Sequence, residues 1–387
     1  MTRSVSNHPR FYANVAPGVD FDQHNPEQFN AEYLRGWMNK LDADQRKVGL
    51  SFVFSLLNGP PASLRAACEK LRLAADQTGI SILPTFDVQN WWDYRRDLWN
   101  WFDPGQPGFN PDNRDNVEWT GPSRDNAVSV SWRNWGSQIR VAPPPNLRSR
   151  SFRAAAETVW MDVVRPWAKW LHNGSPGAHV CPGVKIGWEA SIGVNAFIYP
   201  GMAHPITQTV ALDRHDGLDH RKGLFSGCAE QGWAALHSAG KTLPTRIALP
   251  DVEWIVGDYL SWLTRMTASC GLDAKQIFTH AGGQYAPYAL HTSHSVGRCK
   301  GSTPGFSLYN TLPKKAGDLL AVISKSPDNA WCVAEWMSFA ATPEAWADDV
   351  MTTLLAGNCR FIAAYNAQDL VQNVIYKRGV KLILGQL

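Results

Sequence analysis

The strongest constraint on the fold is a repeated alternation of short apolar strands with helical patterns. Residues 48–57 form a nearly continuous run of apolar residues, which is typical of a strand buried on both faces. A helical pattern follows over residues 61–75, and a second strand pattern covers residues 79–86. Strand, helix and strand at this spacing predict a βαβ unit, and therefore a parallel sheet.

The same alternation continues along the chain. Further helices are predicted at residues 26–41, 151–172, 218–238, 251–269, 315–324 and 343–355, and further strands at 183–189, 276–280, 330–335 and 359–365. Weaker strand patterns at residues 11–15 and 245–249 complete eight strand–helix pairs. We therefore predict an α/β fold, a single (β/α)8 TIM barrel over residues 1–387, with enlarged loops after strands 3, 4 and 6. The longest is an insertion of about residues 87–150 at the barrel mouth, where such barrels build their sites.

Composition excludes several classes of function. The hydrophobic fraction of 44% and charged fraction of 18% are typical of a globular protein. A net charge of +3 without any run of Lys and Arg argues against a nucleic-acid partner. No apolar stretch approaches the length of a membrane span, and the seven scattered cysteines favour reduced thiols in the core. Without an apolar signal region the chain is expected to be cytoplasmic as written, or periplasmic or secreted if it is a trimmed mature form. The oligomeric state stays open.

Two glutamates are the candidate catalytic residues. Glu189 and Glu335 each close a short apolar run of strand character, and each has a tryptophan beside it. A carboxylate at the end of a buried strand is costly unless it is paired or used, because burial penalises the charged form. Glycoside hydrolysis requires two such groups, one as proton donor and one as nucleophile or base. We predict a glycosidase with a carbohydrate substrate and no metal or cofactor; the structural alternative is that each glutamate pairs with an Arg or Lys.

Other residues at predicted strand ends are candidates for binding the sugar. Tryptophan is unusually frequent, with 18 residues, seven of them between positions 91 and 135, and indole rings suit the C–H faces of a sugar. The predicted substrate-binding residues are Asp87, Asn90, Trp91, Trp92, Trp188, His280, Trp336, Tyr365 and Asn366. The alternative for the aromatic residues is that they pack against one another on top of the barrel.

The arrangement resembles the retaining glycoside hydrolases of clan A, (β/α)8 barrels whose acid/base Glu closes strand four and whose nucleophile Glu closes strand seven. The resemblance rests on residues 185–193 and 331–336. It implies that Glu189 is the acid/base and Glu335 the nucleophile of a double displacement. His280, predicted to end strand six, matches a place where such enzymes often hold a Tyr or His. The family usually has Asn before its acid/base, where this chain has Trp188.

Two other functions remain open. A metal-dependent hydrolase would use loop histidines of the C-terminal half as ligands, and the alternative is that these histidines are solvated or hydrogen-bonded: His204, His215, His220, His280, His291 and His294. However, the spacing H-E-x-x-H of many zinc enzymes is absent. A non-catalytic carbohydrate-binding barrel would keep the aromatic residues without the reaction. The motifs of nucleotide-binding proteins and of serine hydrolases are absent from the sequence.

Overall fold

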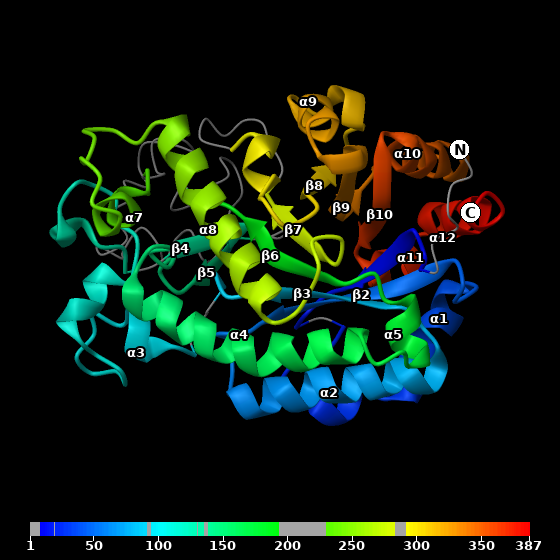
Figure 1. Cartoon of the computed structure of the whole chain (residues 1–387), viewed down its shortest axis with the longest axis horizontal. Coiled ribbons are helices and arrows are strands. Elements are labelled where there is room, and N and C mark those ends of the chain that lie inside the picture. Colours follow the sequence, from blue (N-terminus) through cyan, green and yellow to red (C-terminus); the bar gives the residue numbers. More distant parts are fainter. Residues whose placement is uncertain are drawn as a thin grey trace.

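The computed structural model describes residues 8–18, 20–90, 94–129, 131–134, 138–192, 230–282 and 292–387. Eight parallel strands close into a barrel in which β1 pairs with both β2 and β10 (Figure 1). The strands are β1 (Phe11–Val15), β2 (Val48–Ser55), β3 (Ile82–Asp87), β6 (Val184–Ala190), β7 (Ile277–Ala281), β8 (Gly305–Tyr309), β9 (Ala330–Met337) and β10 (Asn358–Tyr365). The prediction of a single (β/α)8 barrel is confirmed.

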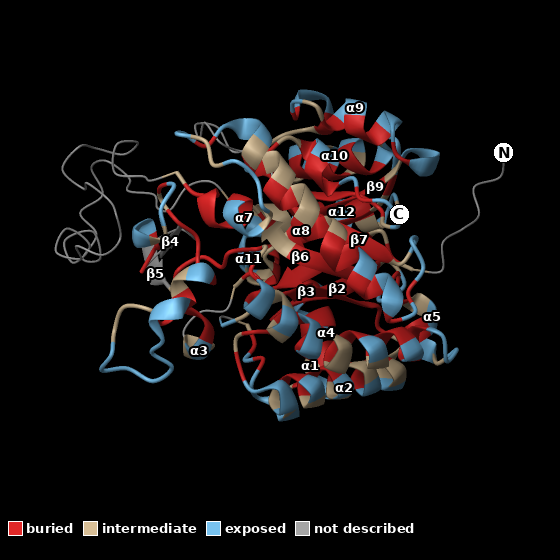
Figure 2. Cartoon of the chain, turned by 60° about the vertical axis from the view of Figure 1, so that its left-hand side comes forward, coloured by how far each residue is buried: buried red, intermediate tan, exposed pale blue. Residues whose placement is uncertain are grey.

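Helices surround the barrel and bury their apolar faces against it, as the red inner and pale blue outer faces in Figure 2 show. The longer ones are α1 (Ala31–Leu41), α2 (Pro61–Thr78), α4 (Arg150–Leu171), α8 (Leu249–Ser269), α10 (Pro343–Leu355) and α12 (Val374–Leu384). The shorter ones are α3 (Arg96–Trp99), α5 (Pro176–Val180), α7 (Trp233–Ser238), α9 (Leu319–Ser324) and α11 (Ala367–Gln372). Capping residues fix where several of them begin: Thr342 accepts the Ala345 N–H at the start of α10.

The barrel interior is arranged in layers because side chains alternate between the two faces of each strand. An apolar cluster near the amino-terminal ends of the strands consists of Tyr12, Leu83, Phe278, Cys332, Phe361 and Ala363. Two residues further along their strands come the buried polar side chains of Asn14, Thr85 and His280. Register places Ser51 beside Asn14 and Lys185 beside Thr85, so both belong to the same polar layer. The carboxyl ends of the strands therefore lie on the far side of the polar layer from this apolar cluster.

The structure corrects the prediction at the fifth and sixth strands. Residues 245–248 are not a strand; they lead into α8, where the Asp251 carboxylate accepts the Ala248 N–H at 3.0 Å. The fifth strand is β7, and the sixth is β8, which the sequence prediction had placed inside a loop. His280 therefore ends strand five rather than strand six. The enlarged loop predicted after strand six in fact follows strand five.

The insertion after β3 is held to the rest of the molecule by buried polar contacts. It contains α3 and the hairpin of β4 (Ser131–Asn134) and β5 (Gln138–Val141), which gather with α7 at one end of the molecule (Figure 1). The buried Glu118 accepts the Gly232 N–H at 3.1 Å just before α7. The indole of Trp119 lies 5.2 Å from the His237 ring. These contacts fix the insertion against the segment that follows the fourth barrel strand.

Of the helix predicted over residues 218–238, the described part forms α7 at residues 233–238, and residues 218–229 lie outside the description. None of the helices in the described ranges has the length and apolar character needed to span a membrane. The six described cysteines are buried free thiols.

Candidate active site

The structure brings the two glutamates together at the carboxyl ends of the fourth and seventh barrel strands, β6 and β9. The hydroxyl of Tyr309, on β8 between them in chain order, lies 2.6 Å from Glu189 Oε1 and 2.7 Å from Glu335 Oε1. The two carboxyl oxygens are therefore no farther apart than about 5.3 Å, the sum of these two hydrogen bonds. Two acidic side chains separated by 146 positions in the sequence thus face one small space.

The two short contacts of Tyr309 constrain the protons of the site. A phenol carries one hydrogen, so it can donate to only one of the two carboxyl groups. The other contact is a hydrogen bond only if that carboxyl group is itself protonated and donates to the phenol oxygen. The observed geometry therefore fits a pair of carboxyl groups that shares one proton. This state avoids two negative charges at such a short distance.

Glu335 is the more deeply buried of the two, with 3% of its surface exposed. Burial raises its pKa to about 8, and the charge of Glu189 adds to the rise. Three groups oppose the rise in pKa by favouring the carboxylate: the hydroxyl of Tyr309, the charge of Lys185 and the indole of Trp188. The Trp188 Nε1–H donates to Glu335 Oε2 at 3.2 Å, so this predicted binding residue holds the opposite carboxylate.

A second polar chain reaches Glu189 from inside the barrel. Ser307 donates to Glu189 Oε1 at 2.8 Å, and its Oγ lies 2.9 Å from His280 Nε2. Burial and the charge of Lys185 lower the pKa of His280 well below its ordinary value, so the imidazole is neutral. Because Ser307 donates to the carboxylate, its oxygen accepts from His280, which assigns the ring hydrogen to Nε2. His280 acts on Glu189 through Ser307.

The backbone is irregular at both glutamates. Glu189 has a φ of 50°, in the left-handed region that side-chain-bearing residues rarely adopt. The register between β6 and β7 shifts between Ile186 and Ala190, and the register between β8 and β9 shifts just before Ser307 pairs with Glu335. Such bulges re-aim side chains at barrel rims. Strained conformations of this kind typically cost about 1–3 kcal/mol and persist where function requires them.

The remaining predicted residues are distributed around this pair. Tyr365 lies at the end of β10. Burial and the charge of Glu335 raise its pKa to about 12, so its hydroxyl is close enough to Glu335 to sense that charge. Asn366 caps α11 by accepting the Asp369 N–H at 2.8 Å. Trp336 is buried and packs its ring against Trp346 of α10, on the outer face of the barrel, away from the carboxyl pair.

Asp87 and Asn90 organise the turn after β3. The buried Asp87 carboxylate accepts the Gln89 N–H at 3.2 Å, the Asn90 N–H at 2.8 Å and the Asn90 side-chain amide at 2.9 Å. Trp91 and Trp92, the other predicted sugar contacts in this segment, lie outside the described residues. A role of these four residues in binding the sugar stays a prediction.

Sequence reasoning missed Tyr309, Ser307 and Lys185. Tyr309 and Ser307 belong to β8, which was hidden in a segment rich in Gly, Ser and Thr. The signal that could have found them is the alternation of Phe306, Leu308 and the polar residues between them, which is typical of a short strand. Lys185 was visible as a charge inside an apolar run two positions before Gly187.

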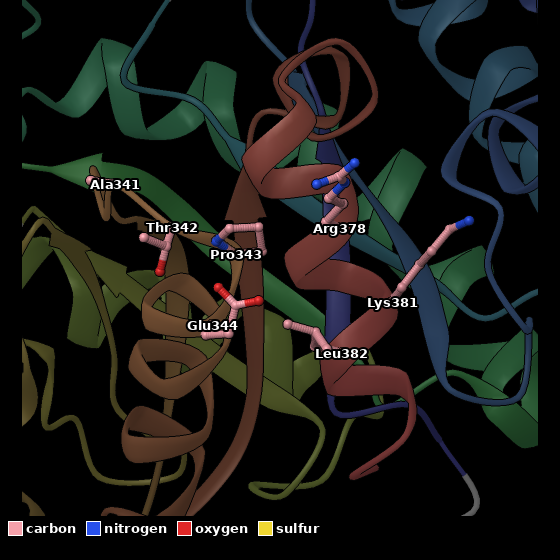
Figure 3. A pocket seen from close by; sticks show the side chains of 7 residues that line it. All are labelled: Ala341, Thr342, Pro343, Glu344, Arg378, Lys381 and Leu382. Atoms are coloured by element: carbon pink, nitrogen blue, oxygen red, sulfur yellow. The ribbon is translucent and has the colours of Figure 1, made fainter.

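A separate hollow lies between α10 and α12, outside the barrel (Figure 3). Its lining residues are Ala341, Thr342, Pro343, Glu344, Arg378, Lys381 and Leu382. None of them was predicted to bind substrate, and Lys381 is engaged in an ion pair with Asp42 at 2.6 Å. The hollow has no contact with the carboxyl pair.

Within the described ranges, no three His, Cys, Asp or Glu side chains are grouped so that they could hold a metal ion. His294 pairs with Asp318 at 2.7 Å. His204, His215, His220 and His291 lie outside the described residues.

No protein-family model matches the sequence, and no curated protein matches it. Solved structures do match. The ligand-free α-N-acetylgalactosaminidase NagBb from Bifidobacterium bifidum is 12% identical with a TM-score of 0.35, and the match covers 98% of this chain and 51% of that one. Pyruvate kinase from Pyrobaculum aerophilum is 11% identical with a TM-score of 0.26, and the match covers 98% of this chain and 71% of that one. The chain thus spans about half the length of the first of these structures, and at such values the likeness carries no argument about chemistry.

Proposed function

We propose that this protein is a retaining glycoside hydrolase that cleaves an O-glycosidic bond in an oligosaccharide or polysaccharide. The observation that carries the proposal is the Tyr309 hydroxyl shared by Glu189 and Glu335, at 2.6 and 2.7 Å. Retaining enzymes hold their two carboxyl groups about 5–5.5 Å apart, whereas inverting enzymes leave about 6.5–9.5 Å for a water molecule. The limit of about 5.3 Å between the Oε1 atoms supports retention.

In the proposed reaction, ionised Glu335 attacks the anomeric carbon and forms a glycosyl-enzyme ester. Glu189 gives its proton to the departing glycosidic oxygen, so the leaving alcohol departs neutral. In the second half, Glu189 takes a proton from water, and the resulting hydroxyl displaces Glu335 from the anomeric carbon. Both carboxyl groups return to their starting states, and the sugar keeps its anomeric configuration.

The bridging phenol offers a route for placing the single proton. Burial raises the pKa of Glu335 while the charge of Lys185 opposes the rise, so the shared proton has two resting places, one on each carboxyl group. A proton moving from Glu335 to the Tyr309 oxygen, while the phenol hydrogen moves to Glu189, gives ionised Glu335 and protonated Glu189. This exchange leaves the charge of the pair unchanged and requires no external base. Ser307 then stabilises whichever form Glu189 holds, because a hydroxyl both donates and accepts.

The test is a panel of nitrophenyl glycosides assayed with the wild type and with the variants Glu189→Gln and Glu335→Gln. Both variants should lose hydrolysis by at least about 10³-fold while sugar binding survives, because the amides keep the shape of the side chains. Glu118→Gln is the matched control, since Glu118 is a buried glutamate like Glu335 but lies in the insertion. It should retain wild-type activity.

The stereochemistry decides the mechanism. With any hydrolysed substrate, the first product seen by proton NMR should have the anomeric configuration of the substrate. A product of inverted configuration would refute double displacement. A wild type that binds sugars but hydrolyses no glycoside would favour the non-catalytic barrel, and activity removed by a chelator and restored by zinc would favour a metal-dependent hydrolase.

A further inference from the structure

We propose that Lys185, buried inside the barrel beneath the carboxyl pair, is a positioning residue that keeps Glu335 in its ionised, attacking form. The effect of Lys185 on catalysis rests on the proposed function, but the contacts of Lys185 do not depend on which substrate is bound. Lys185 lies on the same strand as Glu189, four residues earlier, and is fully buried beside Thr85 in the polar layer of the barrel. Glu189 faces the same interior, where Ser307 and Tyr309 contact its carboxyl group.

The ammonium group of Lys185 crosses the barrel from β6 to β9. Its Nζ donates to the backbone carbonyl of Ala334 at 2.9 Å, and Ala334 is the residue directly before Glu335. This single bond ties the fourth strand to the seventh beneath the reacting carboxyl groups. It also sets a positive charge against the peptide that carries the proposed nucleophile.

A fully buried ammonium group is costly unless a negative charge compensates it. The titratable groups that act on Lys185 or Glu335 from the surrounding strands are Glu189, His280, Tyr309, Cys332 and Tyr365. His280 is neutral, and burial raises the pKa of the tyrosines and of Cys332, so these groups carry no negative charge at neutral pH. Among the groups that the structure describes around Lys185, the two glutamates are those that can supply the compensating charge, and Glu335 is the one next to Ala334.

The electrostatic effects run in both directions. Burial lowers the pKa of Lys185 to about 8, while the charge of Glu335 opposes that decrease. In turn, the charge of Lys185 lowers the pKa of Glu335 against the effect of burial. Each group thus favours the charged form of the other. Glu189 is instead held by neutral hydroxyls, so the cation favours the arrangement in which Glu335 is ionised and Glu189 keeps the proton.

The other polar side chains of the same layer are uncharged. The buried oxygens Asn14 Oδ1, Ser51 Oγ and Thr85 Oγ1 have no hydrogen-bond partner among the described residues. They lie in the same polar layer, on the three strands that precede Lys185 around the barrel. These three oxygens are neutral, so none of them supplies the negative charge that a buried ammonium group requires.

The test compares Lys185→Met and Lys185→Gln with the wild type. Methionine removes both the charge and the hydrogen bond, whereas glutamine removes the charge and keeps a donor for the Ala334 carbonyl. In both variants the acid limb of the kcat/KM profile should move to higher pH by at least about 1 unit, because the carboxylate has lost a nearby cation. Activity at pH 7 should then fall roughly tenfold, while the melting temperature stays the same or rises.

Thr85→Val is the matched control, since Thr85 pairs with Lys185 in the same layer but carries no charge. Its pH profile should be that of the wild type. A folded Lys185→Met or Lys185→Gln protein with an unchanged acid limb overturns the proposal, as does an equal displacement in Thr85→Val. If the acid limb moves only in Lys185→Met, the hydrogen bond to Ala334 and not the charge is responsible, and the proposal is also overturned.

A measurement that requires no hydrolysis distinguishes the role of Lys185 from the proposed function. The infrared carboxyl band that disappears in Glu335→Gln reports the protonation of Glu335 directly. Its titration should move to higher pH in Lys185→Gln and stay in place in Thr85→Val. A protein that hydrolyses no glycoside but shows this displacement would refute the proposed function and leave the role of Lys185 standing.

Discussion

Replacing Tyr309 by Phe tests the arrangement on which the proposed mechanism depends. The change removes one oxygen atom, which contacts Glu189 at 2.6 Å and Glu335 at 2.7 Å, and leaves the ring to fill the same space. A hydrogen bond to a charged group contributes about 1.5–3 kcal/mol. If the ionised nucleophile loses that stabilisation, kcat/KM falls roughly 10- to 150-fold.

The pH dependence gives the sign of the effect. The Tyr309 hydroxyl lowers the pKa of Glu335 against burial, which raises it to about 8. Without the hydroxyl the pKa rises further, so the nucleophile ionises only at higher pH. The acid limb of kcat/KM should therefore move upward in Tyr309→Phe. Substrates with poor leaving groups should suffer most, because they require the proton of Glu189.

Tyr12→Phe is a matched control. The Tyr12 hydroxyl is also buried in the barrel and bonds Ser81 Oγ at 2.9 Å, far from the carboxyl ends of the strands. Its loss should cost about 1 kcal/mol of stability and leave activity unchanged. Thermal unfolding and nitrophenyl glycoside kinetics check both variants. Activity of Tyr309→Phe within twofold of the wild type at every pH, or equal losses in both variants, would refute the reasoning.

Four further substitutions have defined outcomes. Ser307→Ala removes the 2.8 Å bond to Glu189 and should lower kcat roughly tenfold for poor leaving groups only, as a leaving-group series will show. Burial raises the pKa of Glu118 from 4.5 to about 8, so its protonation contributes stability that is fully present below about pH 4.5 and lost as the pH rises to about 8. The melting temperature of Glu118→Gln relative to the wild type should therefore rise between pH 5 and pH 8.5, and a flat difference would contradict this. Gly36→Ala in α1 should raise stability by about 0.5–1 kcal/mol, because nothing lies within 4 Å of the added carbon. In α12, Gly379→Ala should lower stability, because the carbon would lie 2.4 Å from a tryptophan ring; denaturant midpoints compare the two.

The barrel could be predicted because its signal is repeated along the chain. Buried parallel strands read as apolar runs, and β1 and α10 have the predicted bounds. Residues 245–249 misled the prediction because an apolar run also occurs where a helix begins. The Pro250 and Asp251 that follow are the signal of a helix start, with the proline in the first turn and the acid bonding back to Ala248.

The strand β8 was missed for a physical reason. It has five residues and begins with glycine, a residue that usually marks a turn. The glycine is required by packing, since a Cβ at Gly305 would lie 2.2 Å from the carbonyl oxygen of Thr279 on β7. The close approach of two strands is a tertiary fact that no local pattern encodes. Tyr309, which links the whole candidate site, was lost with that strand.

The direction in which the Glu335 side chain points could not be predicted from the sequence. Cys332 belongs to the cluster inside the barrel, and Trp331 and Val333 belong to the core outside it. Strict alternation from Cys332 would turn Glu335 outward, toward the helices. The register shift between β8 and β9 inserts one residue, so that Ser307 pairs with Glu335 instead of Ala334. The irregularity thus turns the carboxyl group into the barrel, and its removal would leave two acidic residues in the sequence without a shared site.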